Sequence, residues 1–317
     1  MTRTQIQDTQ APSPANQAAI QITDLVVKYG PKTAVAGLSL TVPIGSIYGF
    51  LGPNGAGKTT TIKTLLGFRK PSGGGGQVLG LDIVQRSTEV RSRVGYVSEV
   101  GSLYDGLNAD QMGQLFRSTA QHWRQDVFER SLTGFGLPRR VRAGRLSRGM
   151  KMQLAFALAL GGDPEVLILD EPTTGLDPEA RHALLNALVA EVSALGKTVF
   201  FSSHNLAEVE SVADSVGILK DGRLLFSGDL DDLKQRHKIL HLAYAVLPTP
   251  EQVATLRTLP GVAEVEQEGR SLRLKVQGDV PALIRTLHLQ AAQPCDVGVV
   301  DQSLEELFLA LTKRERP

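Results

Sequence analysis

Apolar segments recur along the chain, and their periodicity changes from one segment to the next. Residues 37–42 (GLSLTV) alternate apolar and polar side chains, which predicts a strand with one buried face. Residues 46–51 (SIYGFL), 166–170 (VLILD) and 198–203 (TVFFSS) are largely apolar runs, as expected for parallel strands covered on both faces. Apolar side chains recur at helical spacing after residue 58. Strands that alternate with helices predict an α/β core around a parallel sheet.

Two regions depart from this alternation. Residues from about 104 to 160 have helical spacing with polar outer faces, which predicts an inserted helical subdomain. Residues 239–317 predict the order β-α-β-β-α-β and a closing amphipathic helix, so we expect a small α+β, ferredoxin-like second domain. Asp221-Gly222 lies between two apolar runs and predicts a hairpin. The glycines at 73–76 predict a flexible turn, because no helix follows them.

Composition limits the class of protein. The chain has 317 residues, 42% of them hydrophobic, and its net charge is +1 with Lys and Arg scattered, so we expect no nucleic-acid partner. The single cysteine, Cys295, excludes an internal disulfide and a multi-cysteine metal site. Residues 1–19 are polar and predict a disordered lead-in without the apolar stretch of a signal peptide. The run Leu154–Leu160 falls short of the roughly 18 apolar residues that cross a bilayer and predicts a core helix.

The segment GPNGAGKT at 52–59 matches G-x-x-x-x-G-K-T between a predicted strand and a predicted helix, which is the context of a phosphate loop. Its glycines let successive backbone N–H groups converge on phosphate oxygens. Lys58 places a positive charge on the β- and γ-phosphates, and the Thr59 hydroxyl is a candidate magnesium ligand. The candidate nucleotide-binding residues are Gly52, Pro53, Asn54, Gly55, Ala56, Gly57, Lys58, Thr59 and Thr60.

Carboxylates follow the buried strand at 166–170. Asp170 ends the strand, where a magnesium-holding carboxylate belongs, and Glu171 comes next as the candidate general base. A general base for the attacking water contributes about 10²–10⁴-fold in rate. The alternative is that both acids only solubilise a strand end, but the rigid turn in DEPTTGLDP delivers a further acid, Asp177.

The segment LSRGM at 146–150 reads as a helix start with Ser147 at the N-cap. Gly149 in the first turn weakens that helix by roughly 1 kcal/mol relative to alanine. It also leaves backbone N–H groups exposed, and such groups attract anions. The sequence therefore predicts an anion at this helix start.

Together these motifs resemble the ATP-binding cassette (ABC) ATPases, specifically the nucleotide-binding subunits of ABC transporters, over about residues 20–230. LSRGM resembles the family signature LSGGQ, and TTGLD resembles the D-loop. His204 in FFSSHNLAEVE falls at the switch histidine, and Tyr29 in VVKYG falls where an aromatic residue stacks on adenine. The C-terminal SLEELFLALT resembles the tail of exporter-type members of a bacterial branch.

The resemblance implies a P-loop ATPase core over residues 20–235 with an antiparallel β-subdomain and the helical subdomain, followed by an accessory domain over 239–317. It implies ATP and Mg²⁺ as cofactors, and the lack of an N-K-x-D stretch agrees with ATP over GTP. The resemblance also implies nucleotide-binding roles for Ser147, Gly149 and Asp177. The signature helix is expected to face the ATP bound by a second ATPase subunit. His204 is expected to act in catalysis as a sensor of the γ-phosphate.

The function implied is an ATP-hydrolysing subunit that dimerises around two ATP molecules. It would lie in the cytoplasm, peripheral on the inner face of the cell membrane, and power a separately encoded permease of an exporter. Whether its partner subunit is identical remains open. The alternative function is that of a soluble ABC ATPase acting on nucleic acid or ribosomes. The sequence argues against it, because it lacks a long coiled-coil insertion, zinc-binding cysteines and a second cassette.

Two departures from the family pattern matter. Glu99 stands where the family usually has Gln, at the expected position of magnesium and the attacking water. A carboxylate there repels the γ-phosphate unless the metal offsets its charge. A low-turnover nucleotide switch is therefore a third candidate function. Arg148 and Met150 replace Gly and Gln of the signature, while Ser147 and Gly149 remain.

Overall fold

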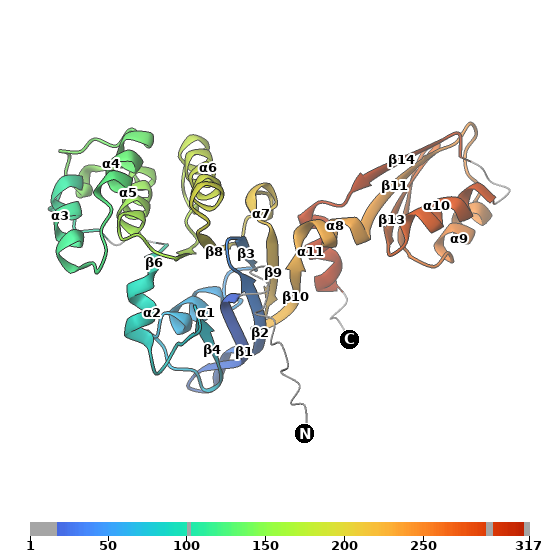
Figure 1. Ribbon diagram of the computed structural model, residues 1–317. Helices are drawn as coiled ribbons and strands as arrows, with labels where there is room; N and C mark the ends of the chain where they lie inside the picture. The colour runs from blue at the N-terminus through green and yellow to red at the C-terminus, as the bar shows by residue number, and fades with distance from the viewer. Residues whose placement is uncertain (1–17, 100–102, 290–293, 314–317) are drawn as a thin grey trace, which may run out of the picture. The chain divides into compact units, whose positions relative to one another are not determined.

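The computed structural model describes residues 18–99, 103–289 and 294–313, which form two compact units (Figure 1). Unit 1 runs through the described residues up to His204 and adds Leu219–Leu224. Unit 2 comprises Asn205–Ile218 and the described residues from Leu225 onward. The predicted lead-in lies outside the described residues as far as residue 17, but Ala18 and Ala19 already belong to the first strand. The predicted domain boundary near residue 235 stays a prediction.

Unit 1 contains an antiparallel sheet of order β2-β1-β4-β5. Its strands are β1 (Ala18–Tyr29), β2 (Lys32–Pro43), β4 (Gly73–Val78) and β5 (Leu81–Asp82). The flexible turn predicted at residues 73–76 is wrong, because these glycines pair with β1. A Cβ on Gly74 would lie 2.0 Å from the carbonyl oxygen of Asp24 and one on Gly76 would lie 2.9 Å from that of Gln21. The glycines thus allow close approach of two backbones at an irregular register.

The second sheet has the order β10-β9-β3-β8-β7-β6. Its strands are β3 (Ile47–Leu51), β6 (Val94–Val97), β7 (Val166–Asp170), β8 (Thr198–Ser203), β9 (Ser215–Lys220) and β10 (Arg223–Asp229). The pairs β3–β8, β7–β8 and β6–β7 are parallel. All residues of β3, β7 and β8 are buried, as their apolar runs predicted. Unit 1 also contains the helices α1 (Lys58–Leu65), α2 (Ser87–Arg93) and α6 (Pro178–Leu195) (Figure 1).

The helical subdomain of unit 1 contains α3 (Ala109–Thr119), α4 (Gln125–Gly134) and α5 (Arg148–Gly161), with a 3₁₀ turn at Ala143–Arg145. Its apolar core joins all three helices, with Met112, Phe128, Leu132, Leu154 and Leu158 buried. The Trp123 ring packs on that of Phe128, with centroids 5.3 Å apart. The insertion predicted at about 104–160 therefore has a hydrophobic core of its own.

Unit 2 contains a four-stranded antiparallel sheet of order β12-β13-β11-β14. Its elements are α7 (Leu206–Val212), α8 (Leu230–Arg236), β11 (His237–Ala243), α9 (Pro250–Arg257), β12 (Val262–Glu268), β13 (Ser271–Gln277), α10 (Val280–Leu289), β14 (Asp296–Asp301) and α11 (Leu304–Lys313). The order from β11 to β14 is the β-α-β-β-α-β pattern expected from the sequence. Apolar side chains of β11 and β13 form one core with those of α9 and α10.

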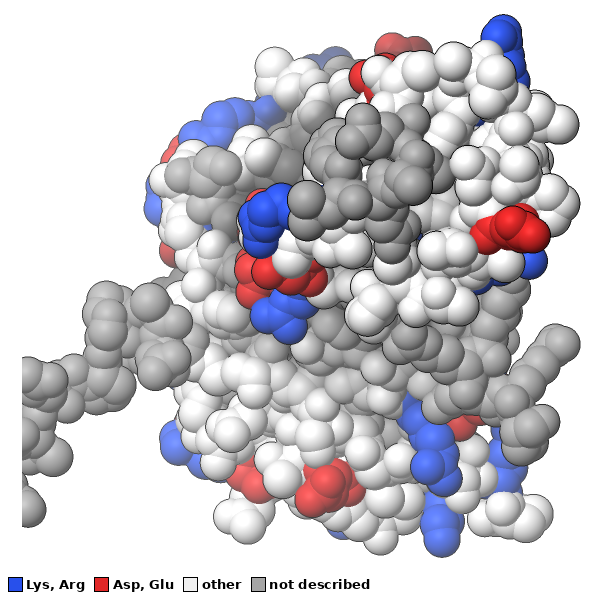
Figure 2. Space-filling view, turned by 90° about the vertical axis from the view of Figure 1, so that its right-hand side faces the viewer, with Lys and Arg blue, Asp and Glu red and all other residues white. Residues whose placement is uncertain are grey.

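The surface carries both signs of charge. On the face shown in Figure 2, Lys and Arg side chains are interspersed with Asp and Glu among the described residues. This distribution matches a net charge of only +1. In the part of the chain that the structure describes, no helix has the length and apolarity needed to cross a membrane.

Candidate nucleotide-binding site

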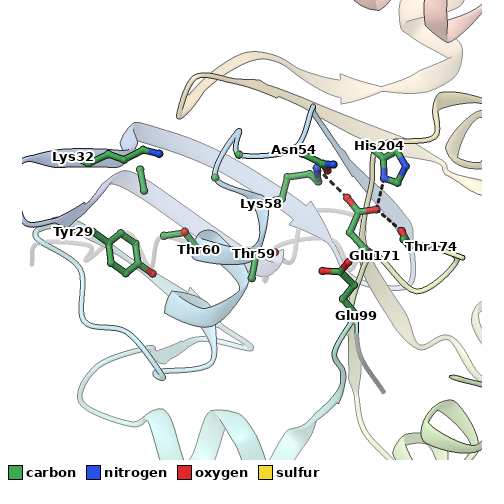
Figure 3. Close-up of a pocket in the computed structure, with 13 residues that line it drawn as sticks. Tyr29, Lys32, Asn54, Lys58, Thr59, Thr60, Glu99, Glu171, Thr174 and His204 are labelled. Atoms are coloured by element: carbon green, nitrogen blue, oxygen red, sulfur yellow. Dashed lines mark hydrogen bonds and ion pairs between the residues drawn. The ribbon is translucent and has the colours of Figure 1, made fainter. Parts of the chain in front are cut away.

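The phosphate loop connects β3 to α1 and borders a cavity of about 600 Å³ in unit 1 (Figure 3). Gly57 caps α1 with a φ of 111°, and no side chain caps this helix start, so its N–H groups face outward for an anion. A Cβ on Gly52 would lie 2.4 Å from the carbonyl oxygen of Leu219. The cavity is lined by Tyr29, Lys32, Ala34, Asn54, Gly55, Gly57, Lys58, Thr59, Thr60, Glu99, Glu171, Thr174 and His204.

Lys58 begins α1 and is only 5% exposed. Its Nζ donates to the carbonyl oxygens of Gly52 at 2.5 Å and Pro53 at 3.2 Å. It also lies 3.0 Å from Glu171 Oε1, and this pair is buried on both sides. A buried ammonium requires such partners, because an unpaired charge inside a protein is costly.

Glu171 follows β7 with a φ of 50°, in the left-handed region that residues other than glycine seldom adopt. Backbone strain of this kind clusters at functional sites. Its N–H donates to Ser202 Oγ at 3.0 Å, which helps to hold the turn. Its Oε2 accepts a hydrogen bond from Thr174 Oγ1 at 3.1 Å and lies 2.7 Å from His204 Nδ1 (Figure 3).

Opposing effects act on the pKa of Glu171. Burial raises it, but hydrogen bonds and charge from Lys58 and His204 outweigh burial and leave it below its ordinary value. Glu171 is therefore ionised at neutral pH, and its carboxylate can accept a proton from a water molecule.

Asp170 ends β7 beside the phosphate loop. Its Oδ1 accepts from Thr59 Oγ1 at 3.0 Å and from Ser202 Oγ at 2.9 Å. Burial and the charge of Asp170 raise the pKa of Tyr96 to about 12. One hydroxyl and one carboxylate fit Mg²⁺, which prefers oxygen ligands and fills its remaining positions with water and phosphate oxygens. Thr59 and Asp170 would hold the ion.

Two predicted residues lie at the rim of the cavity. The Tyr29 ring is 44% exposed, and the Arg69 guanidinium lies over it, 4.1 Å from the ring centroid. This cation–π contact holds one face of the ring, and stacking of Tyr29 on adenine stays a prediction. Glu99 is exposed in a turn after β6 and also lines the cavity (Figure 3). Glu99 and Glu171 both line this cavity, and the position of Glu99 at the attacking water stays a prediction.

The signature residues gather elsewhere in unit 1, at the start of α5. Ser147 caps this helix and accepts from the Met150 N–H at 3.2 Å. A Cβ on Gly149 would lie 3.0 Å from Ala180 Cβ, so this glycine also permits close packing against α6. Asp177 Oδ1 accepts from the Ala180 N–H at 2.9 Å. Ser147, Gly149 and Asp177 thus form a second cluster, and none of them lines the cavity.

Arg148, a departure from the signature, lies over the D-loop. A Cβ on Gly175 would lie 2.8 Å from Nη1 and 2.9 Å from Cζ of Arg148. Its guanidinium therefore covers the backbone of this glycine, whose φ is 73°.

Four residues of the site escaped the sequence reasoning. Lys32, Ala34 and Thr174 line the cavity, and Ser202 connects Asp170 to Glu171. Ser202 had a signal, because a serine inside an otherwise apolar strand needs a buried hydrogen-bond partner. Lys32 and Thr174 had none beyond their nearness to Tyr29 and Glu171 in the sequence.

The fold and the site define a P-loop nucleotide-binding protein with a separate signature helix. The family model for ABC transporters matches residues 35–174. The Nod factor export ATP-binding protein I of Burkholderia lata is 35% identical, over 94% of this chain and 98% of its own length. The bacitracin transport ATP-binding protein BcrA of Bacillus licheniformis is 39% identical, over 69% of this chain and 72% of its own.

A solved ATP-binding subunit of an ABC transporter superimposes with a TM-score of 0.62 at 31% identity, covering 68% of this chain and 92% of that one. The chain therefore belongs to the ABC transporter family, as an ATP-binding subunit. Its class is that of ATP hydrolases which power membrane permeases, and this confirms the resemblance inferred from the sequence.

Proposed function

We propose that this chain binds ATP with Mg²⁺ at the phosphate loop, dimerises so that each ATP lies between two subunits, and powers an export permease at the inner face of the membrane. The observation that carries the proposal is the separation of the two half-sites. Lys58 and Glu171 meet at the cavity, and Asp170 bonds to Thr59 of its lining. Ser147 and Gly149 lie at a different helix start. A second subunit would supply the missing half.

The chemistry is hydrolysis of the γ-phosphate. Lys58 pairs with β- and γ-phosphate oxygens, and Glu171 accepts the proton of the attacking water. His204 and Thr174 hold the second oxygen of that carboxylate, which orients the first. Thr59 and Asp170 would hold a magnesium ion, which would supply positive charge to neutralise the phosphates. Tyr29 stacks on adenine at the exposed rim.

The composite site is tested by mixing two inactive variants. Lys58→Ala disables a subunit's own phosphate loop, and Ser147→Arg places a bulky side chain at the helix start offered to the partner. In a mixed dimer one site carries both defects and the other is intact, so the mixture should recover ATPase activity. Formation of mixed dimers is measured in parallel with differently tagged subunits.

Full activity of Ser147→Arg alone would contradict the composite site. Mixed dimers without recovered activity would contradict a homodimer in which one site works by itself. A matched control is Ser131→Arg on α4, because among the described residues Ser131 Oγ donates to the Val127 carbonyl oxygen of its own helix. This control should leave turnover unchanged on its own.

A substitution of Glu99 tests the third candidate function, that of a low-turnover nucleotide switch. If magnesium offsets its charge, Glu99→Gln should change turnover by less than about tenfold, which is roughly 1.4 kcal/mol of barrier. A much larger loss in steady-state ATPase assays would mean that the carboxylate itself takes part in the chemistry. A large gain would mean that Glu99 suppresses hydrolysis, as a switch requires.

An apolar surface of unit 1 supports docking of the permease. Leu103, Tyr104, Leu115 and Phe116 line a hollow of about 450 Å³, and the Tyr104 side chain is 61% exposed. A cavity of about 620 Å³ adjoins it, sharing Leu103 and Phe116. Exposed apolar patches mark interaction sites. A cytoplasmic segment of the permease with apolar side chains is the proposed occupant.

The partner is tested by purification from detergent-solubilised membranes of the source organism. The tagged wild-type chain should retain an integral membrane protein, identified by mass spectrometry, and Phe116→Asp should lose it. The matched control Val246→Asp replaces an equally apolar, 75% exposed side chain of unit 2 and should retain the permease. Recovery of nucleic acid or ribosomes instead would favour the rival function.

A further inference from the structure

Glu210 lies on α7, the helix that begins two residues after the proposed γ-phosphate sensor His204. Its carboxylate has two partners from later elements of unit 2. Oε1 lies 2.9 Å from Lys234 Nζ on α8, and Oε2 accepts from the Leu304 N–H at 3.1 Å, at the first residue of α11. The Glu210 side chain is 25% exposed and that of Lys234 is 20% exposed, so solvent screens this pair only in part.

The start of α11 explains why a carboxylate belongs there. The first N–H groups of a helix have no partner within the helix, and the helix dipole favours negative charge at this end. Ser303 Oγ accepts from the Glu306 N–H, and Glu306 Oε2 accepts from the Ser303 N–H, so α11 caps part of its own start. The Leu304 N–H is satisfied from α7 instead.

The other end of α7 is fixed beside His204. Asn205 is its N-cap and accepts from the Glu208 N–H at 3.4 Å, while Asn205 Nδ2 donates to Glu208 Oε1 at 2.8 Å. The helix has only 7 residues. Its N-cap, Asn205, is joined directly to His204, whose Nδ1 lies 2.7 Å from Glu171 Oε2.

We propose that Glu210 is a positioning residue for His204, so that α8 and α11 set the place of the imidazole at the ATP site. This role rests on the proposed function of His204. The C-terminal part of the chain then controls turnover without contributing a group to the chemistry.

The experiment compares Glu210→Ala, His204→Ala and the double variant in the full chain, with ATP turnover and nucleotide affinity measured separately. Glu210→Ala should lower kcat by about tenfold, equal to 1.4 kcal/mol of barrier, and leave the Kd for ATP unchanged. In the His204→Ala background the same substitution should change kcat by less than about twofold, because the group it positions is gone.

Glu306→Ala is the matched control. It removes a carboxylate that, among the described residues, bonds to Ser303 at the same helix start and to Arg273 on β13. It should lower the melting temperature and leave kcat unchanged. Glu210→Gln keeps the shape of the side chain and its acceptor for Leu304 while losing the charge pair with Lys234, and it supports the role by a smaller loss of kcat if Glu210→Ala fails to fold.

Two results separate the possible failures. If His204→Ala lowers kcat but the losses of Glu210→Ala and His204→Ala multiply in the double variant, Glu210 acts independently of His204 and the positioning role is overturned. If His204→Ala retains wild-type kcat, the proposed function of His204 fails, and the positioning role fails with it. An unchanged kcat in both Glu210→Ala and Glu210→Gln also overturns the role.

Discussion

Two networks of cations and carboxylates occupy the two units, and they differ in burial. At the ATP site, Lys58 and Glu171 are both less than 10% exposed. Lys58 also contacts backbone carbonyl oxygens, and Glu171 also contacts Thr174 and His204. On the sheet of unit 2, Lys275 lies 2.6 Å from Glu264, and these side chains are 21% and 45% exposed.

Arg273 extends the network of unit 2 to Glu266 and Glu306. Ion pairs that solvent reaches contribute little to folding, while breaking a buried pair leaves a charge without compensation. The distance between opposite charges is similar in both networks. Burial of the side chains is therefore what distinguishes the network at the ATP site from the ion pairs on the sheet of unit 2.

The largest effect is expected for Glu171→Gln, which tests whether the buried network is chemical. The variant should bind ATP and accumulate as a dimer, but its turnover should fall by about 10²–10⁴-fold because the amide cannot accept the proton. Steady-state hydrolysis and size-exclusion chromatography with ATP would measure both. Near wild-type turnover would show that another group is the base.

Asp170→Asn should also lose turnover, through poor Mg²⁺ binding.

A pH series of the nucleotide-free protein sharpens the contrast between the networks. The folded-state pKa of Glu171 is lowered, so its ionised form stabilises the fold at neutral pH, and this contribution is lost as the pH falls through the folded pKa. Wild type should exceed Glu171→Gln by about 2 kcal/mol in unfolding free energy at pH 7. The difference should shrink below the ordinary glutamate pKa of about 4.3. A constant difference in urea titrations would contradict the ion pair.

Tyr29 tests whether an exposed side chain at the rim of the ATP site still matters. Loss of stacking on a base costs about 1–3 kcal/mol, so Tyr29→Ala should weaken ATP binding by roughly tenfold. Tyr29→Phe keeps the ring and is the control. Equilibrium titration with ATP and with tripolyphosphate distinguishes the outcomes, since only ATP affinity should fall. Equal losses for both ligands would place Tyr29 at the phosphates instead.

The smallest effect is expected on the sheet of unit 2. Lys275→Ala should change the free energy of unfolding by no more than about 0.5 kcal/mol, because its partners are open to solvent. ATP turnover should not change. Chemical denaturation monitored through unit 2 would measure the effect, and a loss of several kcal/mol would remove the distinction drawn between the two networks.

The sequence predicted the elements that depend on local pattern. The buried strands β7 and β8 and the phosphate loop follow from apolar runs and glycine spacing. The glycines of β4 did not, because their role is to let β1 approach, and pairing between distant segments leaves no local pattern.

The residues of the candidate site divide in the same way, into those that a sequence motif predicts and those that only the folded chain brings into contact. Lys58, Asp170 and Glu171 belong to motifs with fixed spacing, and the structure brings them together. Thr174 and Ser202 act through hydrogen bonds to those residues, which only the folded chain shows. The grouping of α7 with the C-terminal elements likewise depends on contacts such as that of Glu210 with Leu304.

The pairing of Lys58 with Glu171 has a kinetic consequence. Under the proposed function, a phosphate that pairs with Lys58 would compete with the Glu171 carboxylate, which lies 3.0 Å from the same ammonium. Glu171 would then act as an intramolecular competitor of nucleotide binding. Binding of nucleotide would in turn free this carboxylate to accept a proton from the attacking water.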